Sequence, residues 1–235
     1  YSILPTVTQY ARNSLFAGLM PLAIENIYPN LWLNDEDEGL KNKYEEDLFT
    51  CQLKRLGINE KVFFEKVTAI SAGKKLPDKI QQILSHKISI IVYNFVDNLS
   101  HARTEMDMIK ELAADEKAYR SLTLSWFKHS PLLEVMKELS AKGVRVVLTT
   151  DHGSIKVTDP VKVVGDKNIT SNLRYKQGKT LQYNPKEVFE IKNPKLAQLP
   201  ACHLSSTYVF TMGNDFFAYP NNYNHYVKYY KDTLQ

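Results

Sequence analysis

Two pairs of side chains in this sequence combine a carboxylate with an imidazole, and each pair follows an apolar run. Asp151 and His152 are adjacent, whereas Asp97 and His101 are four residues apart. If Asp97 opens a helix, this spacing places both of its side chains on one face, within reach of a single ion. Oxygen and nitrogen ligands together suit zinc better than magnesium. Each pair alone also fits an ordinary turn or a helix cap beside a surface histidine.

A threonine hydroxyl is the candidate nucleophile. Thr6 and Thr8 fall where a strand expected over residues 1–4 gives way to a helix with an apolar stripe. A hydroxyl at a helix start commonly caps the helix, but it can also attack phosphorus, because free amides and the helix dipole attract phosphate there. Two metal ions, one for each pair of ligands, could flank the hydroxyl and lower its pKa. The spacing alone supports a candidate metal-assisted site.

The elements expected to position these residues follow an α/β pattern. Residues 89–95 and 144–149 are apolar and β-branched, which is typical of strands buried on both faces of a parallel sheet. Ser130 and Pro131 predict the start of a helix that ends at Gly143, directly before the second of these strands. This order indicates a doubly wound sheet, in which ligands collect at the carboxyl ends of the strands.

The rest of the chain is more polar. Residues 28–87 are predicted to form a helical insertion or cap, with a charged solvated face. Further strands are expected at 161–164, 188–191 and 207–212. The basic cluster around Arg174 could clamp a phosphate, or it could be a solvated loop. Neither His203 nor His225 lies at an interpretable spacing from a possible partner residue. Both are interpreted as structural or surface residues.

The composition of the chain argues against several classes of protein. The chain has 235 residues, of which 30 are basic and 26 acidic, and the net charge of +4 is too small to argue for nucleic-acid binding by itself. Cys51 and Cys202 lie far apart, which indicates neither a zinc ribbon nor a disulfide framework and favours a reducing, cytoplasmic setting. No run approaches the roughly 20 apolar residues that span a bilayer. The chain begins without Met, so a fragment of a longer protein is expected.

Three segments resemble a known family. LPTVTQYARNSLFAGLMP at 4–21, VDNLSH at 96–101 and TTDHG at 149–153 are similar, in order and spacing, to the PglZ domain of the alkaline phosphatase superfamily. The resemblance implies an α/β fold with a mostly parallel central sheet, helices on both faces and a helical insertion. It extends to the effector domain of a response regulator of bacterial type IX protein secretion. That likeness implies a preceding receiver domain and allows a homodimer.

The resemblance also assigns roles to individual residues. It makes Thr8, the second threonine of a P-T-x-T segment, the nucleophile. The zinc ligands that it implies, for two ions in a complete domain, are Thr8, Asp97, His101, Asp151 and His152. Two further ligands, an aspartate before Tyr1 and a histidine after Gln235, are expected outside this chain, so residues 1–235 are expected to be a partial domain.

The implied activity is zinc-dependent hydrolysis of phosphodiesters in nucleotides or oligonucleotides. Related phosphodiesterases have a phosphate-binding asparagine at the position of Ala11, so Arg12 and Asn13 are expected to take over that contact, with Arg174 as a third candidate. The alternative is a non-catalytic regulatory module with a structural or nucleotide-sensing metal site. An α/β domain without a site is the simplest interpretation.

Overall fold

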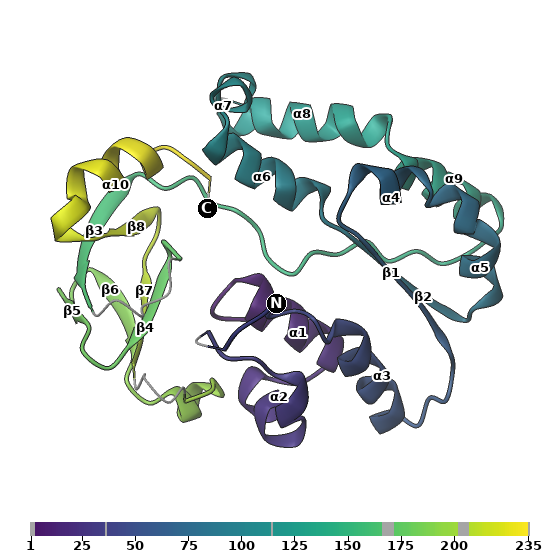
Figure 1. The fold of residues 1–235 in the computed structure, drawn as a ribbon, viewed down its shortest axis with the longest axis horizontal. Coiled ribbons are helices and arrows are strands. Elements are labelled where there is room, and N and C mark those ends of the chain that lie inside the picture. Colours follow the sequence, from purple (N-terminus) through teal and green to yellow (C-terminus); the bar gives the residue numbers. More distant parts are fainter. Residues whose placement is uncertain (1–2, 36, 114, 166–171, 202–206, 235) are drawn as a thin grey trace. The chain divides into compact units, whose positions relative to one another are not determined.

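The structure is a computed structural model that describes residues 3–35, 37–113, 115–165, 172–201 and 207–234 (Figure 1). The chain divides into two compact units. The first unit combines residues 1–55 with 150–235, and the second consists of residues 56–149. Each unit is described by itself.

Short helices open and close the first unit. They are α1 (Thr8–Ala17), α2 (Pro21–Ile27), η1 (Pro29–Leu31), α3 (Glu45–Arg55), η3 (Pro194–Ala197), η4 (Pro220–Asn222) and α10 (Tyr223–Tyr230). Gly18 ends α1 in the left-handed region, at φ 60°, where a side chain would be strained. Pro21 then starts α2 at a position where a missing amide hydrogen costs nothing. Residues 3–4 form no strand, contrary to the prediction for 1–4, of which residues 1–2 lie outside the described residues.

The strands of the first unit form two small sheets. They are β3 (Asp159–Val164), β4 (Tyr175–Gly178), β5 (Gln182–Tyr183), β6 (Val188–Ile191), β7 (Thr207–Thr211) and β8 (Asp215–Ala218). One sheet has the order β5-β3-β8, with β3 and β8 parallel, and the other is the antiparallel sheet β4-β7-β6. The strands predicted at 161–164, 188–191 and 207–212 are therefore confirmed.

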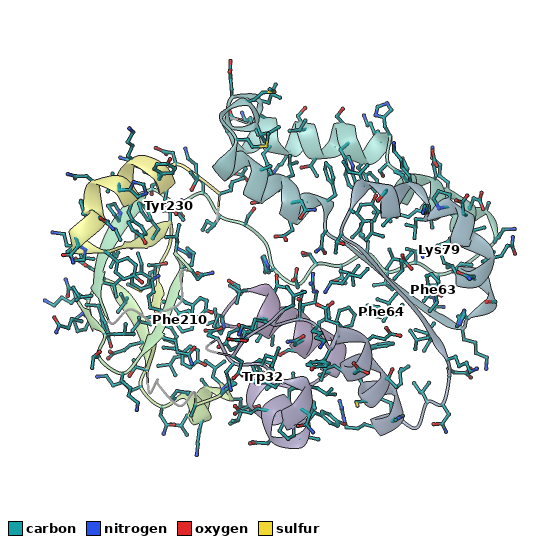
Figure 2. All side chains as sticks on the ribbon, viewed as in Figure 1. Trp32, Phe63, Phe64, Lys79, Phe210 and Tyr230 are labelled. Carbon is teal, nitrogen blue, oxygen red and sulfur yellow. The ribbon has the colours of Figure 1, made fainter. Side chains whose placement is uncertain are left out.

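Helix α1 packs on the antiparallel sheet through Tyr10. This side chain is fully buried, and its ring lies edge-on to Trp32, with centroids 5.6 Å apart; Trp32 is labelled in Figure 2. Its hydroxyl lies 3.2 Å from the hydroxyl of Tyr208 on β7. Burial raises the pKa of Tyr10 well above its usual value, so the hydroxyl stays neutral. The start of α1 is thereby attached to a rigid support.

Lys176 on β4 is fully buried, with Nζ 4.8 Å from the ring centroid of Tyr219. Burial lowers the pKa of Lys176 to about 7, whereas the pKa in an unfolded chain is about 10.4. Between these values the unfolded chain binds a proton that the folded protein lacks, so the free energy of unfolding contributed by this group rises with pH.

We therefore expect Lys176→Met to flatten the rise in unfolding free energy between about pH 7 and pH 9, by up to about 1.4 kcal/mol per pH unit. Urea unfolding across this range measures the slope. Lys179→Met is the matched control, because Lys179 follows the same strand but is exposed. Equal slopes in Lys176→Met and the unmodified protein would show that Lys176 keeps an ordinary pKa.

The second unit contains a two-stranded parallel sheet with helices beside it (Figure 1). Its elements are β1 (Val62–Val67), α4 (Ile70–Lys74), η2 (Pro77–Lys79), α5 (Ile80–Ser85), β2 (Ile88–Tyr93), α6 (Phe95–Glu105), α7 (Asp107–Leu112), α8 (Glu116–Lys128) and α9 (Pro131–Ala141). The strand predicted at 89–95 is confirmed as β2, although it ends at Tyr93 and Phe95 begins α6. Ser130 caps α9 as predicted, since its Oγ accepts from the amide of Leu133 at 3.2 Å. No helix among the described residues is long and apolar enough to cross a membrane.

The prediction of a strand at residues 144–149 is wrong. These residues have no regular secondary structure and join no sheet, and Val147 and Leu148 are 81% and 73% exposed. The amide of Val144 donates to the carbonyl of Leu139 at the end of α9. An apolar, β-branched run favours extended backbone, but a strand also needs a neighbouring strand for its amides and carbonyls.

The predicted fold class is confirmed in its mixture of helices and strands, and the mostly parallel central sheet is only partly evident among the described residues. The described strands form sheets of two, three and three strands, and their parallel pairs are β1–β2 and β3–β8. The segment 28–87 contains α3, α4 and α5 and also strand β1.

Candidate metal centre

The hydroxyl of Thr8 does not cap helix α1. Thr8 is the first residue of the helix, and the cap position belongs to Val7, whose side chain makes no capping bond. Instead, Thr8 Oγ1 lies 3.4 Å from Nε2 of His152. Thr8 is partly exposed, so the hydroxyl is near the surface and beside an imidazole.

The ring nitrogen of His152 that lies near Thr8 is Nε2. Its Nδ1 lies 3.0 Å from the backbone carbonyl oxygen of Gly153. Because a carbonyl can only accept a hydrogen bond, Nδ1 is the donor in this contact, and in the neutral imidazole Nε2 then carries the lone pair. Histidines that bind metals are commonly oriented in this way, by a bond from the other ring nitrogen to a carbonyl.

One carboxylate oxygen of Asp151 accepts a hydrogen bond, and the other oxygen has no hydrogen-bond partner. Oδ1 accepts from the backbone amide of His152 at 3.1 Å. Oδ2 is buried, has no hydrogen-bond partner and lies 3.9 Å from Nε2 of His152. A buried carboxylate oxygen without a partner is costly, and a bound cation would remove that cost.

The loop that carries both residues is fixed by its own hydrogen bonds. Thr150 Oγ1 donates to the backbone carbonyl of His152 at 2.7 Å. This bond adds to those made by Asp151 Oδ1 and by the imidazole, so the acid and the imidazole are held by their neighbours in sequence. The role of Thr150 was not predicted, because hydroxyl–carbonyl bonds of this kind have no distinctive sequence signal.

The start of α1 adds a site for an anion. The amides of Tyr10 and Ala11 donate to the carbonyl of Val7, while those of Thr8 and Gln9 have no acceptor within the helix. Unpaired amides and the positive end of the helix dipole favour a phosphate near Thr8.

The three donor atoms suit one zinc ion. Two ligands of a tetrahedral zinc, each about 2.1 Å from the ion, lie about 3.4 Å apart. The 3.4 Å from Thr8 Oγ1 to His152 Nε2 matches this spacing, and the 3.9 Å from His152 Nε2 to Asp151 Oδ2 is close to it. A hydroxyl, a carboxylate and a lone-pair nitrogen are also ligands that zinc accepts.

The other predicted metal pair lies in the second unit. Asp97 and His101 are one turn apart on α6, which confirms the helical spacing; Asp97 is exposed, and the His101 side chain is outside the described residues. Among the residues that the structure describes, no three histidine, cysteine, aspartate or glutamate side chains gather as a metal site. Within the first unit, the hydroxyl of Thr8 is a possible third donor atom beside Asp151 and His152.

The predicted phosphate ligands make contacts within the protein. The guanidinium of Arg12 pairs with Glu45, and Asn13 Nδ2 donates to the carbonyl of Lys41 at 2.9 Å. Arg174 donates to the carbonyl of Asp215, and burial lowers the pKa of Arg174. Thr6, the alternative nucleophile, is exposed. His203 lies outside the described residues, and His225 is on the surface of α10.

Comparison with known families identifies a family model that covers nearly the whole chain. The model of the BREX system PglZ alkaline phosphatase-like domain matches residues 1–229. No curated protein matches the chain.

Proposed function

The chain belongs to the PglZ alkaline phosphatase-like family, and we propose that it is a zinc-dependent phosphoesterase with Thr8 as its nucleophile. The observation that carries the proposal is the convergence of Thr8 Oγ1 and the unpaired Asp151 Oδ2 on Nε2 of His152. This arrangement unites a nucleophile with two metal-binding groups. The family match supports a hydrolase by analogy of fold.

Each residue has a separate part in the proposed reaction. Asp151 Oδ2 and His152 Nε2 would hold zinc beside Thr8. When bound, the ion supplies positive charge that lowers the pKa of the Thr8 hydroxyl and neutralises charge on the phosphate. Thr8 Oγ1 then loses its proton to solvent and attacks phosphorus in line, while the bond from phosphorus to the leaving oxygen breaks and that oxygen takes up a proton from solvent. Water hydrolyses the resulting threonine ester and restores the hydroxyl.

We propose a phosphodiester rather than a phosphomonoester as the substrate, as the family resemblance implies. A diester carries a single negative charge, and the amides at the start of α1 favour an anion there. Arg12 and Arg174, the predicted phosphate ligands, are engaged with Glu45 and with the carbonyl of Asp215. Nucleotides and oligonucleotides are the proposed substrates on the basis of the same resemblance.

Two further parts of the proposal follow from the family resemblance. Asp97 and His101 on α6 would hold a second zinc ion. The chain would act as the effector domain of a response regulator in type IX secretion, after a receiver domain and in a homodimer.

Removal of metal tests the proposed function. We expect the purified protein to hydrolyse bis(p-nitrophenyl) phosphate faster than p-nitrophenyl phosphate. Dialysis against EDTA should lower turnover of the diester at least about a hundredfold, because a bound metal contributes several kcal/mol to transition-state stabilisation. Added zinc should restore it.

Magnesium added to the dialysed protein is the control for a general cation effect. Turnover that survives chelation would contradict a metal-dependent mechanism. Stoichiometric zinc binding without hydrolysis of either ester would favour the regulatory binding module instead.

A further inference from the structure

Helix α10 has one face in the core and one face in solvent. Tyr223, Tyr226 and Tyr230 pack on a buried cluster of the first unit; Tyr230 is labelled in Figure 2. The members of that cluster are Val157, Leu173, Phe216 and Ala218. His225, Lys228 and Tyr229 are exposed on the same helix. The inward tyrosines fix α10, so the exposed side chains project from a rigid element.

His225 and Tyr229 form an aromatic platform on the exposed face. They are one helical turn apart, their ring centroids are 4.6 Å apart and the planes are inclined by 31°. Tyr229 is 50% exposed. The two rings order each other and leave an aromatic surface to solvent. Such a surface can stack on any planar ring, including every nucleobase.

The surroundings of this platform are basic. Residues 220–231 contain no aspartate or glutamate, and they include the exposed Lys228 and Lys231. Lys162 Nζ lies 5.2 Å from the ring centroid of Tyr223. The next acid along the chain, Asp232, is paired with Lys156 at 2.9 Å. The local charge is thus complementary to phosphate, although the charge of the whole chain is nearly balanced.

A polar hollow of about 290 Å³ adjoins the platform at the start of α10. Its lining residues are Pro220, Asn221, Asn222, Tyr223, Asn224 and His225. Each asparagine amide offers both a donor and an acceptor, as the edge of an unpaired base requires. The hollow therefore supplies hydrogen-bonding groups next to stacking groups and positive charge.

We propose that this surface, which we call the α10 face (Asn221, Asn222, Asn224, His225, Lys228, Tyr229 and Lys231), binds single-stranded nucleic acid. A base stacks on the platform of His225 and Tyr229, the asparagines bind base edges, and the lysines bind phosphates. Stacking requires bases that are not already paired and stacked in a duplex. The α10 face would hold the oligonucleotide substrate of the proposed phosphodiesterase, and this role rests on that function.

Fluorescence anisotropy with a labelled single-stranded DNA of about 12 nucleotides tests the proposal. EDTA in the buffer prevents metal-dependent hydrolysis, so binding is measured alone. We expect Tyr229→Ala to raise Kd about tenfold, because one stacked base is lost. Phe189→Ala is the matched control: Phe189 is also 50% exposed, lies on β6, and its substitution should leave Kd unchanged.

The salt dependence of Kd tests the phosphate contact separately. Lys228→Ala should reduce the slope of log Kd against log salt concentration by about 0.7, the value for one phosphate contact to a single strand. Lys195→Ala, which removes an exposed lysine on η3, should leave the slope unchanged.

Three results would overturn the proposal: an unchanged Kd in both Tyr229→Ala and His225→Ala, equal affinity for the DNA and for inorganic polyphosphate, or no DNA binding. Circular dichroism of each variant verifies its fold. Oligonucleotide binding without diester hydrolysis would contradict the proposed function alone. Hydrolysis of the chromogenic diester without oligonucleotide binding would contradict the α10 face alone.

Discussion

Thr8→Val lowers kcat for a chromogenic phosphodiester by about ten-thousand-fold or more, even at a zinc concentration that saturates the variant, since the nucleophile is lost. Saturating zinc is needed because Thr8 Oγ1 is also a proposed ligand of the ion. Valine has nearly the shape of threonine, and Thr8 makes no capping bond, so the start of α1 should be unchanged. The loss should appear in kcat rather than in KM, because the hydroxyl acts in the chemical step. Steady-state kinetics with zinc present measures both constants.

Thr6→Val is the matched control for this substitution. Thr6 lies two residues earlier, is exposed and precedes the helix. Its hydroxyl should contribute little to turnover. Full activity in Thr8→Val would contradict the nucleophile assignment, and a loss confined to Thr6→Val would transfer the role to Thr6.

Asp151→Asn and His152→Ala each lower the affinity for zinc at least about a hundredfold, because each removes a metal ligand. Diester hydrolysis should fall with zinc occupancy. Zinc content after dialysis against a weak chelator measures the change. His129→Ala is a control for the histidine: Nδ1 of His129 also bonds a backbone carbonyl, that of Ser125 at 2.9 Å, but on the exposed end of α8.

The same aspartate gives a readout that separates a metal ligand from a structural residue. In the metal-free protein, Asp151 Oδ2 is a buried oxygen without a partner. Asp151→Asn should therefore preserve or raise the free energy of unfolding without metal, while it abolishes the stabilisation by zinc. A large loss of stability in the metal-free variant would indicate a structural role for Asp151.

Local signals in the sequence predicted several helices and strands, whereas the core of the candidate site was predicted from the family resemblance. Ser130 and Gly143 bracket α9 as predicted, because caps and helix-ending glycines act within one turn. The structure also brings Thr8 near His152, although 144 positions separate them in the chain. That contact was predicted from the family resemblance, whereas spacing alone left the cap of α1 and an ordinary turn as alternatives.

The other features could not be predicted because they depend on contacts between residues that are far apart in the sequence. Arg12 and Glu45, which form an ion pair, are 33 positions apart. No local sequence signal identifies either residue as the partner of the other. Residues 144–149 had the composition of a buried strand, but composition does not specify which strand is available for pairing. The burial of Lys176 likewise depends on neighbours from distant segments, so its lowered pKa had no local signal.

Anomalous scattering at the zinc edge, from crystals grown with zinc, tests the central claim most directly. The claim is that Thr8, Asp151 and His152 are ligands of one ion. The account predicts an anomalous peak within about 2.3 Å of Thr8 Oγ1, Asp151 Oδ2 and His152 Nε2. Zinc bound elsewhere in the chain, with Asp151 Oδ2 still unpaired, would contradict it.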